Sequence, residues 1–181
     1  GWSLPTTCST ACRSTGSSTA SASRTPPREP GRLTTRHCPA TPARPRDNIA
    51  VGAHLRHRAR KDALAAAEKV AADVGLAELL DRPAASLTVA AAKRLELARA
   101  LATGPKLLLL DEVLTGLTPI EAKTGVELVR KVRDTGVTVL MVEHVMEIVM
   151  PLVDRAIVLD LGKVLVEGKP SDVVRDPKVI G

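Results

Sequence analysis

The residues best placed for chemistry follow two aliphatic runs of the chain. A run of four leucines ends in Asp111 and Glu112, and the run VTVLMV ends in Glu143 and His144. A carboxylate at a strand end can hold Mg²⁺ through its water shell, because a hard cation prefers oxygen ligands. A neighbouring carboxylate can activate an attacking water, and a histidine can donate a hydrogen bond to a terminal phosphate. These residue types favour phosphoryl transfer, in which catalysis is positioning plus electrostatics.

The two runs are predicted to be neighbouring strands of one sheet. Both 107–110 and 137–142 are short and continuously apolar, which is typical of parallel strands buried on both faces. A helix is predicted between them, because Thr118 can cap it, Pro119 suits its first position and Glu121 completes a capping box. Since parallel strands end at one edge of a sheet, we expect the residues that follow both strands to lie close together.

Other segments complete an α/β pattern. Further helices are predicted over 61–80, 91–103, 145–153 and 172–176, the first with an interruption at Gly75, and a hairpin is predicted from 156–159 and 164–166. Alternating strands and helices predict an α/β fold with a mostly parallel sheet flanked by helices. No apolar stretch approaches the roughly 18 residues that a membrane-spanning helix needs.

Composition divides the chain into two parts. Residues 1–46 contain seven Arg, seven Pro, no Lys and one acidic residue, whereas 47–181 contain 19 basic and 19 acidic residues. The net charge of +6 therefore lies in residues 1–46, the head, and does not indicate a folded nucleic-acid-binding surface. Because Trp2 is the only aromatic residue, an aromatic platform for stacking bases is excluded as well. The head lacks helical or strand periodicity and is predicted to be disordered. Its three cysteines, one of them next to His37, are interpreted as incidental thiols and not as a zinc site.

Five segments of 47–181 resemble the ATP-binding subunits of ABC transporters. LLLLDEVLTGLTP resembles the Walker B strand and D-loop, VTVLMVEHVMEIV the histidine-switch segment, and LTVAAAKRLELARALAT the signature segment with its helix. DNIAVGAHLR and LDLGKVLVEGKPSDVVRDPKVI look most like the subunits of branched-chain amino acid transporters. All five occur in the order found in the family. The resemblance implies a partial P-loop NTPase domain that couples ATP hydrolysis to import.

The resemblance also implies a role for each matching residue. Asp111 would be the Mg²⁺-associated carboxylate, acting through water, Glu112 the general base and His144 the γ-phosphate contact, while Thr118 would lie in the D-loop at a dimer interface. The signature loop, which contacts the nucleotide held by a partner subunit, would be Leu87, Thr88, Val89, Ala90 and Ala91. The implied cofactors are ATP and Mg²⁺. The implied partners are transmembrane permease subunits and a second ATP-binding subunit, with no nucleic acid, at the cytoplasmic face of the cell membrane.

The sequence departs from the family pattern at the phosphate-binding positions. Both glycines of the signature loop are replaced, and G-x-x-x-x-G-K-[ST] does not occur, since the first lysine is Lys61. We therefore interpret 47–181 as the C-terminal part of the domain and 1–46 as an out-of-frame head, and we expect the chain alone to be inactive. The alternative is a non-catalytic interaction module that keeps the permease and dimer surface but does not bind ATP.

Overall fold

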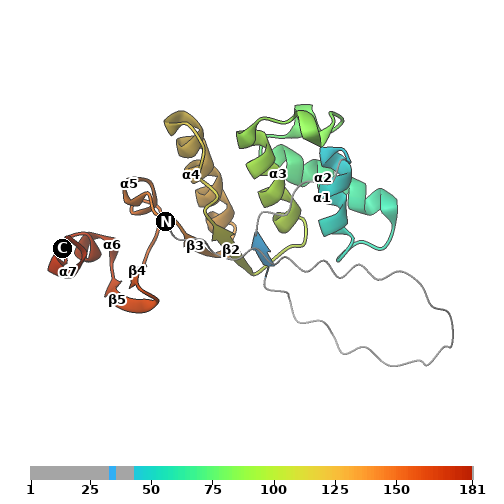
Figure 1. The fold of residues 1–181 in the computed structure, drawn as a ribbon. Helices are drawn as coiled ribbons and strands as arrows, with labels where there is room; N and C mark the ends of the chain where they lie inside the picture. The colour runs from blue at the N-terminus through green and yellow to red at the C-terminus, as the bar shows by residue number, and fades with distance from the viewer. Residues whose placement is uncertain (1–32, 36–42, 181) are drawn as a thin grey trace, which may run out of the picture.

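The structure, a computed structural model, describes residues 33–35 and 43–180 of the chain. It combines a helical region, a parallel sheet with one further long helix, and a C-terminal hairpin with short helices (Figure 1). The α-helices are α1 (Pro45–Ala53), α2 (Arg60–Asp73), α3 (Val89–Leu101), α4 (Pro119–Asp134), α5 (Met146–Val149), α6 (Pro170–Val173) and α7 (Pro177–Ile180). The strands are β1 (Leu33–Thr35), β2 (Leu107–Asp111), β3 (Thr138–Val142), β4 (Ala156–Asp160) and β5 (Lys163–Gly168), and two 3₁₀ turns, η1 (Ala77–Leu79) and η2 (Ala84–Ser86), lie between α2 and α3.

Strand β2 is the centre of a three-stranded parallel sheet. It pairs with β1 on one side and with β3 on the other. Leu107 is opposite Thr138, and the register continues to Asp111 opposite Val142. The predicted parallel sheet is confirmed, and the ends of β2 and β3 lie side by side. Strands β4 and β5 form a separate antiparallel hairpin, as predicted.

Strand β1 falls inside the head that was predicted to be disordered. That prediction does not hold for 33–35, which pair in parallel with Leu108–Leu110, nor for 43–46, where α1 begins. Strand pairing uses backbone groups and therefore needs no apolar pattern, and threonine suits a strand. The rest of the head, with its cysteines at 8, 12 and 38, lies outside the described residues.

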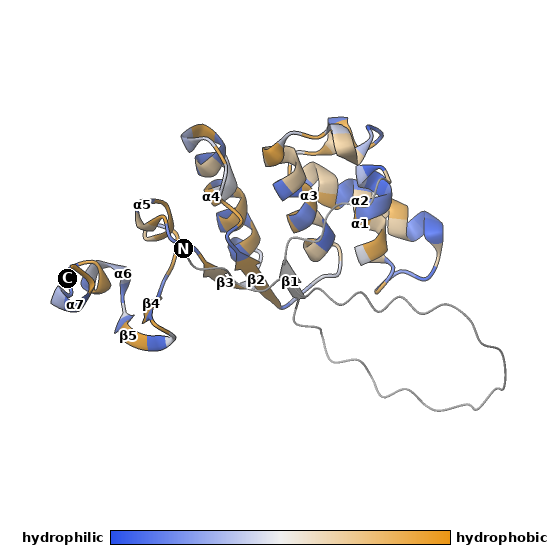
Figure 2. Ribbon diagram, viewed as in Figure 1, coloured by the Kyte–Doolittle hydropathy of each residue, from blue (hydrophilic) through white to orange (hydrophobic). Residues whose placement is uncertain are grey.

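Helices α3 and α4 cover the same face of the sheet (Figure 1). The strands follow one another across the sheet in chain order, and right-handed crossovers in one direction place their helices on one face. Leu108 and Leu110 point to this face and are buried. On the opposite face, Leu140 and Val142 are 53% and 59% exposed. The prediction that both strands are buried on both faces is therefore wrong for β3, which Figure 2 shows as hydrophobic in colour.

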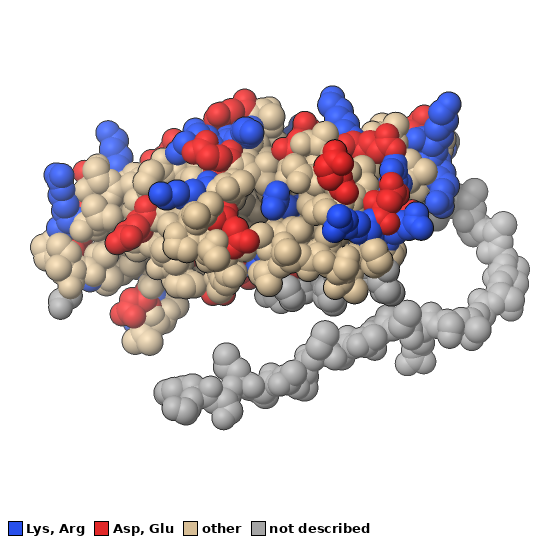
Figure 3. Space-filling view, turned by 90° about the horizontal axis from the view of Figure 1, so that it is seen from above, with Lys and Arg blue, Asp and Glu red and all other residues tan. Residues whose placement is uncertain are grey.

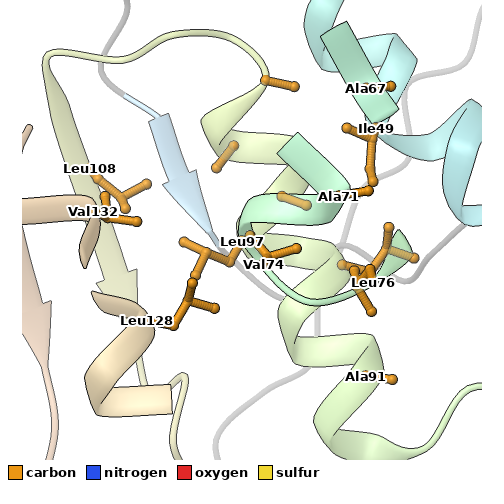
Figure 4. Packing of buried hydrophobic residues seen from close by; sticks show 14 of the residues in the cluster. Ile49, Ala67, Ala71, Val74, Leu76, Ala91, Leu97, Leu108, Leu128 and Val132 are labelled. Atoms are coloured by element: carbon orange, nitrogen blue, oxygen red, sulfur yellow. The ribbon is translucent and has the colours of Figure 1, made fainter. Parts of the chain in front are cut away.

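The core of the helical region is built largely from alanine. Ala63, Ala67 and Ala71 recur on the buried face of α2, and Ile49 of α1 packs into the same cluster (Figure 4). Small side chains let helices approach closely, and an added Cβ at Gly52 would lie 2.3 Å from the carbonyl oxygen of Arg99. Alanine and glycine thus set the spacing between α1 and α3.

Several predicted helix boundaries differ from the structure. The helix predicted over 61–80 ends at Asp73 and is followed by a 3₁₀ turn, and the helix predicted over 145–153 is reduced to 146–149. The helix predicted over 172–176 is replaced by α6, which ends at Val173, and α7, which begins at Pro177. Pro170 and Pro177 explain the shift, because proline favours the first turn of a helix. Helix α1 was not predicted at all.

Candidate functional site

The candidate site is the edge of the sheet where β2 and β3 end. Asp111 is the last residue of β2 and lies opposite Val142, the last residue of β3. Glu112 follows Asp111 directly, and His144 lies two residues beyond Val142. Asp111, Glu112 and His144 are all exposed. The structure therefore places the three predicted catalytic and metal-binding residues at one solvent-accessible edge, as the strand pattern predicted.

The backbone of Glu112 is held from two sides. Its N–H donates to the carbonyl oxygen of Val142 at 2.9 Å, which extends the pairing of β2 and β3 by one residue. Its carbonyl oxygen accepts a hydrogen bond from Lys93 Nζ of α3 at 3.3 Å. Between these contacts Glu112 has φ of +49°, a left-handed conformation that residues other than glycine seldom adopt. Such strain persists where the surroundings impose it, and it is frequent at functional sites.

Glu143 is a residue of this edge to which the sequence alone assigned no role. Its Oε1 accepts a hydrogen bond from the backbone N–H of Leu114 at 2.9 Å. Its Oε2 is buried and has no hydrogen-bond partner among the described residues. The side chain joins the turn after β2 to the turn after β3. In the sequence, the only sign of this contact is the acidic residue at position 143, directly before His144. Nothing in the sequence indicates that its partner is the amide of Leu114.

Thr118 forms the predicted capping box at the start of α4. The Thr118 hydroxyl accepts from Glu121 N at 3.4 Å, and Glu121 Oε2 accepts from Thr118 N at 2.9 Å. The hydrogen bonds donated by the Thr118 backbone and hydroxyl hold the pKa of Glu121 below its usual value. In this chain Thr118 is thus accounted for by its role as a cap, and its place in an interface remains a prediction.

Residues 87–91 lead into α3 and form its first turn. Thr88 is the N-cap residue, and its hydroxyl accepts from Ala91 N at 3.3 Å. Leu87, Thr88 and Val89 are at least partly exposed, whereas Ala90 and Ala91 are buried. One turn further along α3, Lys93 contacts Glu112, so the first turns of the helix lie beside the end of β2.

The edge fits only part of an Mg²⁺–ATP site. Exposed carboxylates at Asp111 and Glu112 suit a hard cation with its water shell. The backbone amides of the following turn are already used within the chain, because Glu112 N, Leu114 N and Thr118 N each donate to a protein oxygen. No two successive amides of residues 112–118 are therefore free to form a nest for a phosphate, and the sequence contains no phosphate-binding loop.

The described part of the chain holds neither a ready metal cluster nor a membrane-spanning helix. Within 33–35 and 43–180, no group of three or more His, Cys, Asp or Glu side chains is arranged to hold a metal ion. No helix in the described part of the chain is long and apolar enough to cross a membrane. Seen from the side of the helices, basic and acidic side chains are interspersed, with no extended region of one sign (Figure 3).

Comparison with known proteins points to one family. The sequence profile of the ABC transporter family matches residues 15–115, a match that begins within the head. The high-affinity branched-chain amino acid transport ATP-binding protein LivG of Escherichia coli is 38% identical over 124 residues, which are 68% of this chain and 49% of LivG. The methionine import ATP-binding protein MetN of Cupriavidus metallidurans is 33% identical over 133 residues, 73% of this chain and 39% of MetN. The chain spans about half the length, or less, of the curated relatives that it matches.

Solved structures agree with the sequence comparison. A nucleotide-free ATP-binding cassette from an ABC transporter superposes with a TM-score of 0.72 at 25% identity, over 82% of this chain and 66% of that one. The structure of cbiO1 from Clostridium perfringens, part of the ABC transporter complex cbiONQ, gives a TM-score of 0.69 at 25% identity, over 78% of this chain and 57% of that one.

Proposed function

Because the chain belongs to the ABC transporter family and has the fold of its ATP-binding cassettes, we propose that it is part of the ATP-binding subunit of an importer for branched-chain amino acids. The importer type is supported by the similarity to LivG of Escherichia coli and to BraF of Pseudomonas aeruginosa, which is 36% identical over 124 residues. In this function the subunit binds transmembrane permease subunits and a second ATP-binding subunit at the cytoplasmic face of the membrane, without being inserted in it.

The observation that supports the proposal most directly is the pairing at the end of the sheet. Asp111 opposite Val142, and Glu112 N bonded to Val142 O, bring Asp111, Glu112 and His144 to one edge. Asp111 is proposed to hold Mg²⁺ through water, since it is exposed and lies on the face of the sheet opposite α3 and α4. Glu112 is proposed to take a proton from the attacking water, and His144 to donate a hydrogen bond to the terminal phosphate.

Residues 87–91 and Thr118 are proposed to lie at the interface with the second subunit. Leu87, Thr88 and Val89 are accessible at the start of α3, so a partner can reach them. With alanine at 90 and 91, a phosphate cannot come as close to the backbone as it can at glycine, because a Cβ occupies the space that glycine leaves free. We therefore expect this loop to contact a nucleotide more weakly than a glycine-containing loop.

The second candidate function is an interaction module that does not hydrolyse ATP. It is favoured by one observation, namely that most backbone amides of the turn after β2 already donate within the protein, in a chain whose sequence contains no phosphate-binding loop. Residues 1–181 alone should then bind Mg²⁺–ATP far more weakly than a complete subunit. Calorimetric titration of the purified chain measures this, and micromolar affinity would contradict it.

Catalysis is tested in a chain that carries a phosphate-binding segment upstream of Asp47. Glu112→Gln keeps the shape and hydrogen bonding of the side chain but removes its basicity, so turnover should fall by about 10²–10⁴-fold. Nucleotide affinity should hold or increase, since a negative charge near the phosphates is removed. Glu127→Gln is the matched control, because Glu127 is exposed on α4 and pairs only with Arg130 among the described residues. Equal turnover of Glu112→Gln and the parent would exclude Glu112 as the base.

Asp111→Asn separates metal binding from proton transfer in the same extended chain. The amide is a weaker ligand for a hard cation, so the Mg²⁺ concentration needed for nucleotide binding should rise. Glu112→Gln should leave that requirement unchanged. If both variants change the Mg²⁺ requirement equally, the two carboxylates do not have separate roles.

A further inference from the structure

A cleft between α3 and α4 lies above the end of β2, next to the edge that carries Asp111. The cleft is open to solvent on one side, and its cavity volume is about 80 Å³. The walls are mainly aliphatic, with Leu97 on α3, Leu110 on β2 and Leu128 on α4. Figure 4 shows Leu97 and Leu128 pointing toward one another from the two helices. Apolar clefts with a few convergent polar groups are the usual form of small-molecule sites.

Three charged side chains line the same cleft. Lys93 and Arg94 come from α3 and Glu121 from α4. Lys93 donates to the carbonyl oxygen of Glu112, and Arg94 donates to the carbonyl oxygens of Ala90 and Gly75, so both bond to neutral acceptors. Among the described residues, no carboxylate lies within ion-pairing distance of either cation. The two positive charges are therefore available to an anionic group of a ligand.

Glu121 supplies the complementary negative charge. Both hydrogen bonds from Thr118 go to its Oε2, which leaves Oε1 for another donor. Arg94 is near enough for its charge to contribute to the lowered pKa of Glu121, so the two charges share one end of the cleft. The charge pattern at the cleft is thus two cations and one carboxylate around an aliphatic interior.

We propose that this cleft binds a free aliphatic amino acid. Its carboxylate lies at Lys93 and Arg94, its ammonium group at Glu121, and its side chain among the leucines of the cleft. A fatty acid matches the apolar walls and the cations but has no group for Glu121. A nucleotide matches the cations but finds no aromatic side chain for its base, since Trp2 is the only aromatic residue of the chain.

Binding at this cleft is connected to the proposed catalytic edge through Lys93. Lys93 lines the cleft, and its ammonium group bonds the carbonyl oxygen of Glu112 at 3.3 Å. A ligand carboxylate competes for that group and so changes how the strained backbone of Glu112 is held. The site is therefore an effector site. This regulatory meaning rests on the proposed function, whereas ligand binding itself does not.

The test is a titration of the full chain with L-leucine, followed by the methyl signals of the leucines in ¹H–¹³C NMR spectra. Two analogues each lack one charged group: 4-methylpentanoate has no ammonium and 3-methylbutylamine has no carboxylate. Each should bind about tenfold more weakly than leucine, because each loses a charge-assisted hydrogen bond. Glycine, which lacks the aliphatic side chain, should be weaker still.

Variants locate the binding site on the molecule. Lys93→Gln and Arg94→Gln should each weaken leucine binding about tenfold. Thr124→Leu places a larger side chain at an exposed position that lines the cleft and should block binding without removing a charge. Lys123→Gln is the matched control, since Lys123 is the neighbouring residue and does not line the cleft.

Three results would overturn the proposal. Equal affinity for leucine and 4-methylpentanoate would show that Glu121 takes no part, and leucine binding unaffected by Thr124→Leu would place the ligand elsewhere, for example on the exposed face of β3. Absence of any binding at millimolar leucine would exclude the site outright. Failure of the proposed function is recognised separately, because the hydrolysis assay of the extended chain contains no amino acid.

Discussion

The backbone N–H of Leu114 donates a 2.9 Å hydrogen bond to Oε1 of Glu143, and this contact joins residues 29 positions apart. Leu114 is buried in the turn that leads from Glu112 to α4, and Glu143 precedes His144. A change in either turn is therefore transmitted to the other through one carboxylate. In the proposed function, this bond joins the turn that follows Glu112, which activates water, to the residue next to His144, which contacts the phosphate.

The first prediction concerns that bond. Glu143→Ala removes the acceptor, so the Leu114 amide should exchange with solvent about tenfold faster, equivalent to roughly 1.4 kcal/mol. Glu143→Gln keeps an oxygen acceptor and should retain most of the protection. Hydrogen exchange followed by NMR measures both, with the Thr115 amide, which donates to Glu112 O, as an internal control. Unchanged exchange at Leu114 in Glu143→Ala would contradict the role of Glu143.

The second prediction concerns the positive φ of Glu112. Glycine adopts this conformation without strain, whereas alanine does not. Glu112→Gly should therefore be about 1 kcal/mol more stable to unfolding than Glu112→Ala. At Glu127, inside α4, the order should reverse by a similar amount, since glycine costs about 1 kcal/mol relative to alanine in a helix. Urea denaturation of the four variants measures this, and a Glu112→Ala variant at least as stable as Glu112→Gly would show that Glu112 is not strained.

The third prediction concerns the capping box of α4. Thr118→Ala should reduce the free energy of unfolding by about 1 kcal/mol at neutral pH, because the helix loses its N-cap acceptor. Thr115→Ala, at an exposed position in the preceding turn, should change it by less than about 0.5 kcal/mol. Denaturation midpoints of both variants decide whether the cap or the loss of any threonine is responsible.

The same capping box has a predictable pH dependence. Since the folded state lowers the pKa of Glu121, the stabilisation by its carboxylate is present above the usual glutamate pKa of about 4.3 and is lost as the pH falls through the lower folded value. The stability difference between the parent and Glu121→Gln should accordingly be largest near pH 7 and shrink below about pH 4. A difference that stays constant down to acid pH would show that ionised Glu121 does not stabilise the fold.

The fourth prediction compares two helical glycines. A Cβ at Gly52 meets a backbone oxygen at 2.3 Å, whereas a Cβ at Gly125 meets the end of the Leu114 side chain at 2.8 Å. Gly52→Ala should destabilise the protein by about 1–3 kcal/mol, because α1 and α3 must move apart. Gly125→Ala should cost less, since a side chain can rotate away and alanine favours the helix by about 1 kcal/mol. Thermal unfolding of the two variants tests the order, and a smaller loss for Gly52→Ala would show that the helices separate easily.

Local features of the sequence were sufficient to predict β2, β3, the start of α4 and the candidate edge, although not α1 or β1. The four leucines before Asp111 predicted β2, and the Thr118, Pro119 and Glu121 spacing predicted the start of α4 with its capping box. These signals act within a few residues, through backbone hydrogen bonds and side-chain periodicity. Because parallel strands end at a common edge, they also predicted that Asp111, Glu112 and His144 lie together.

Only the tertiary structure decided which helices and strands pack against one another and which of their faces are buried. The short strand β1, the bond from Leu114 to Glu143 and the cleft between α3 and α4 each join residues far apart in the chain. The exposure of Leu140 and Val142 likewise follows from crossovers that place both helices on one face. An apolar residue has the same local pattern whether a helix covers it or not. Whether a residue is buried depends on which other elements pack over it, so the sequence of one strand alone does not determine its burial.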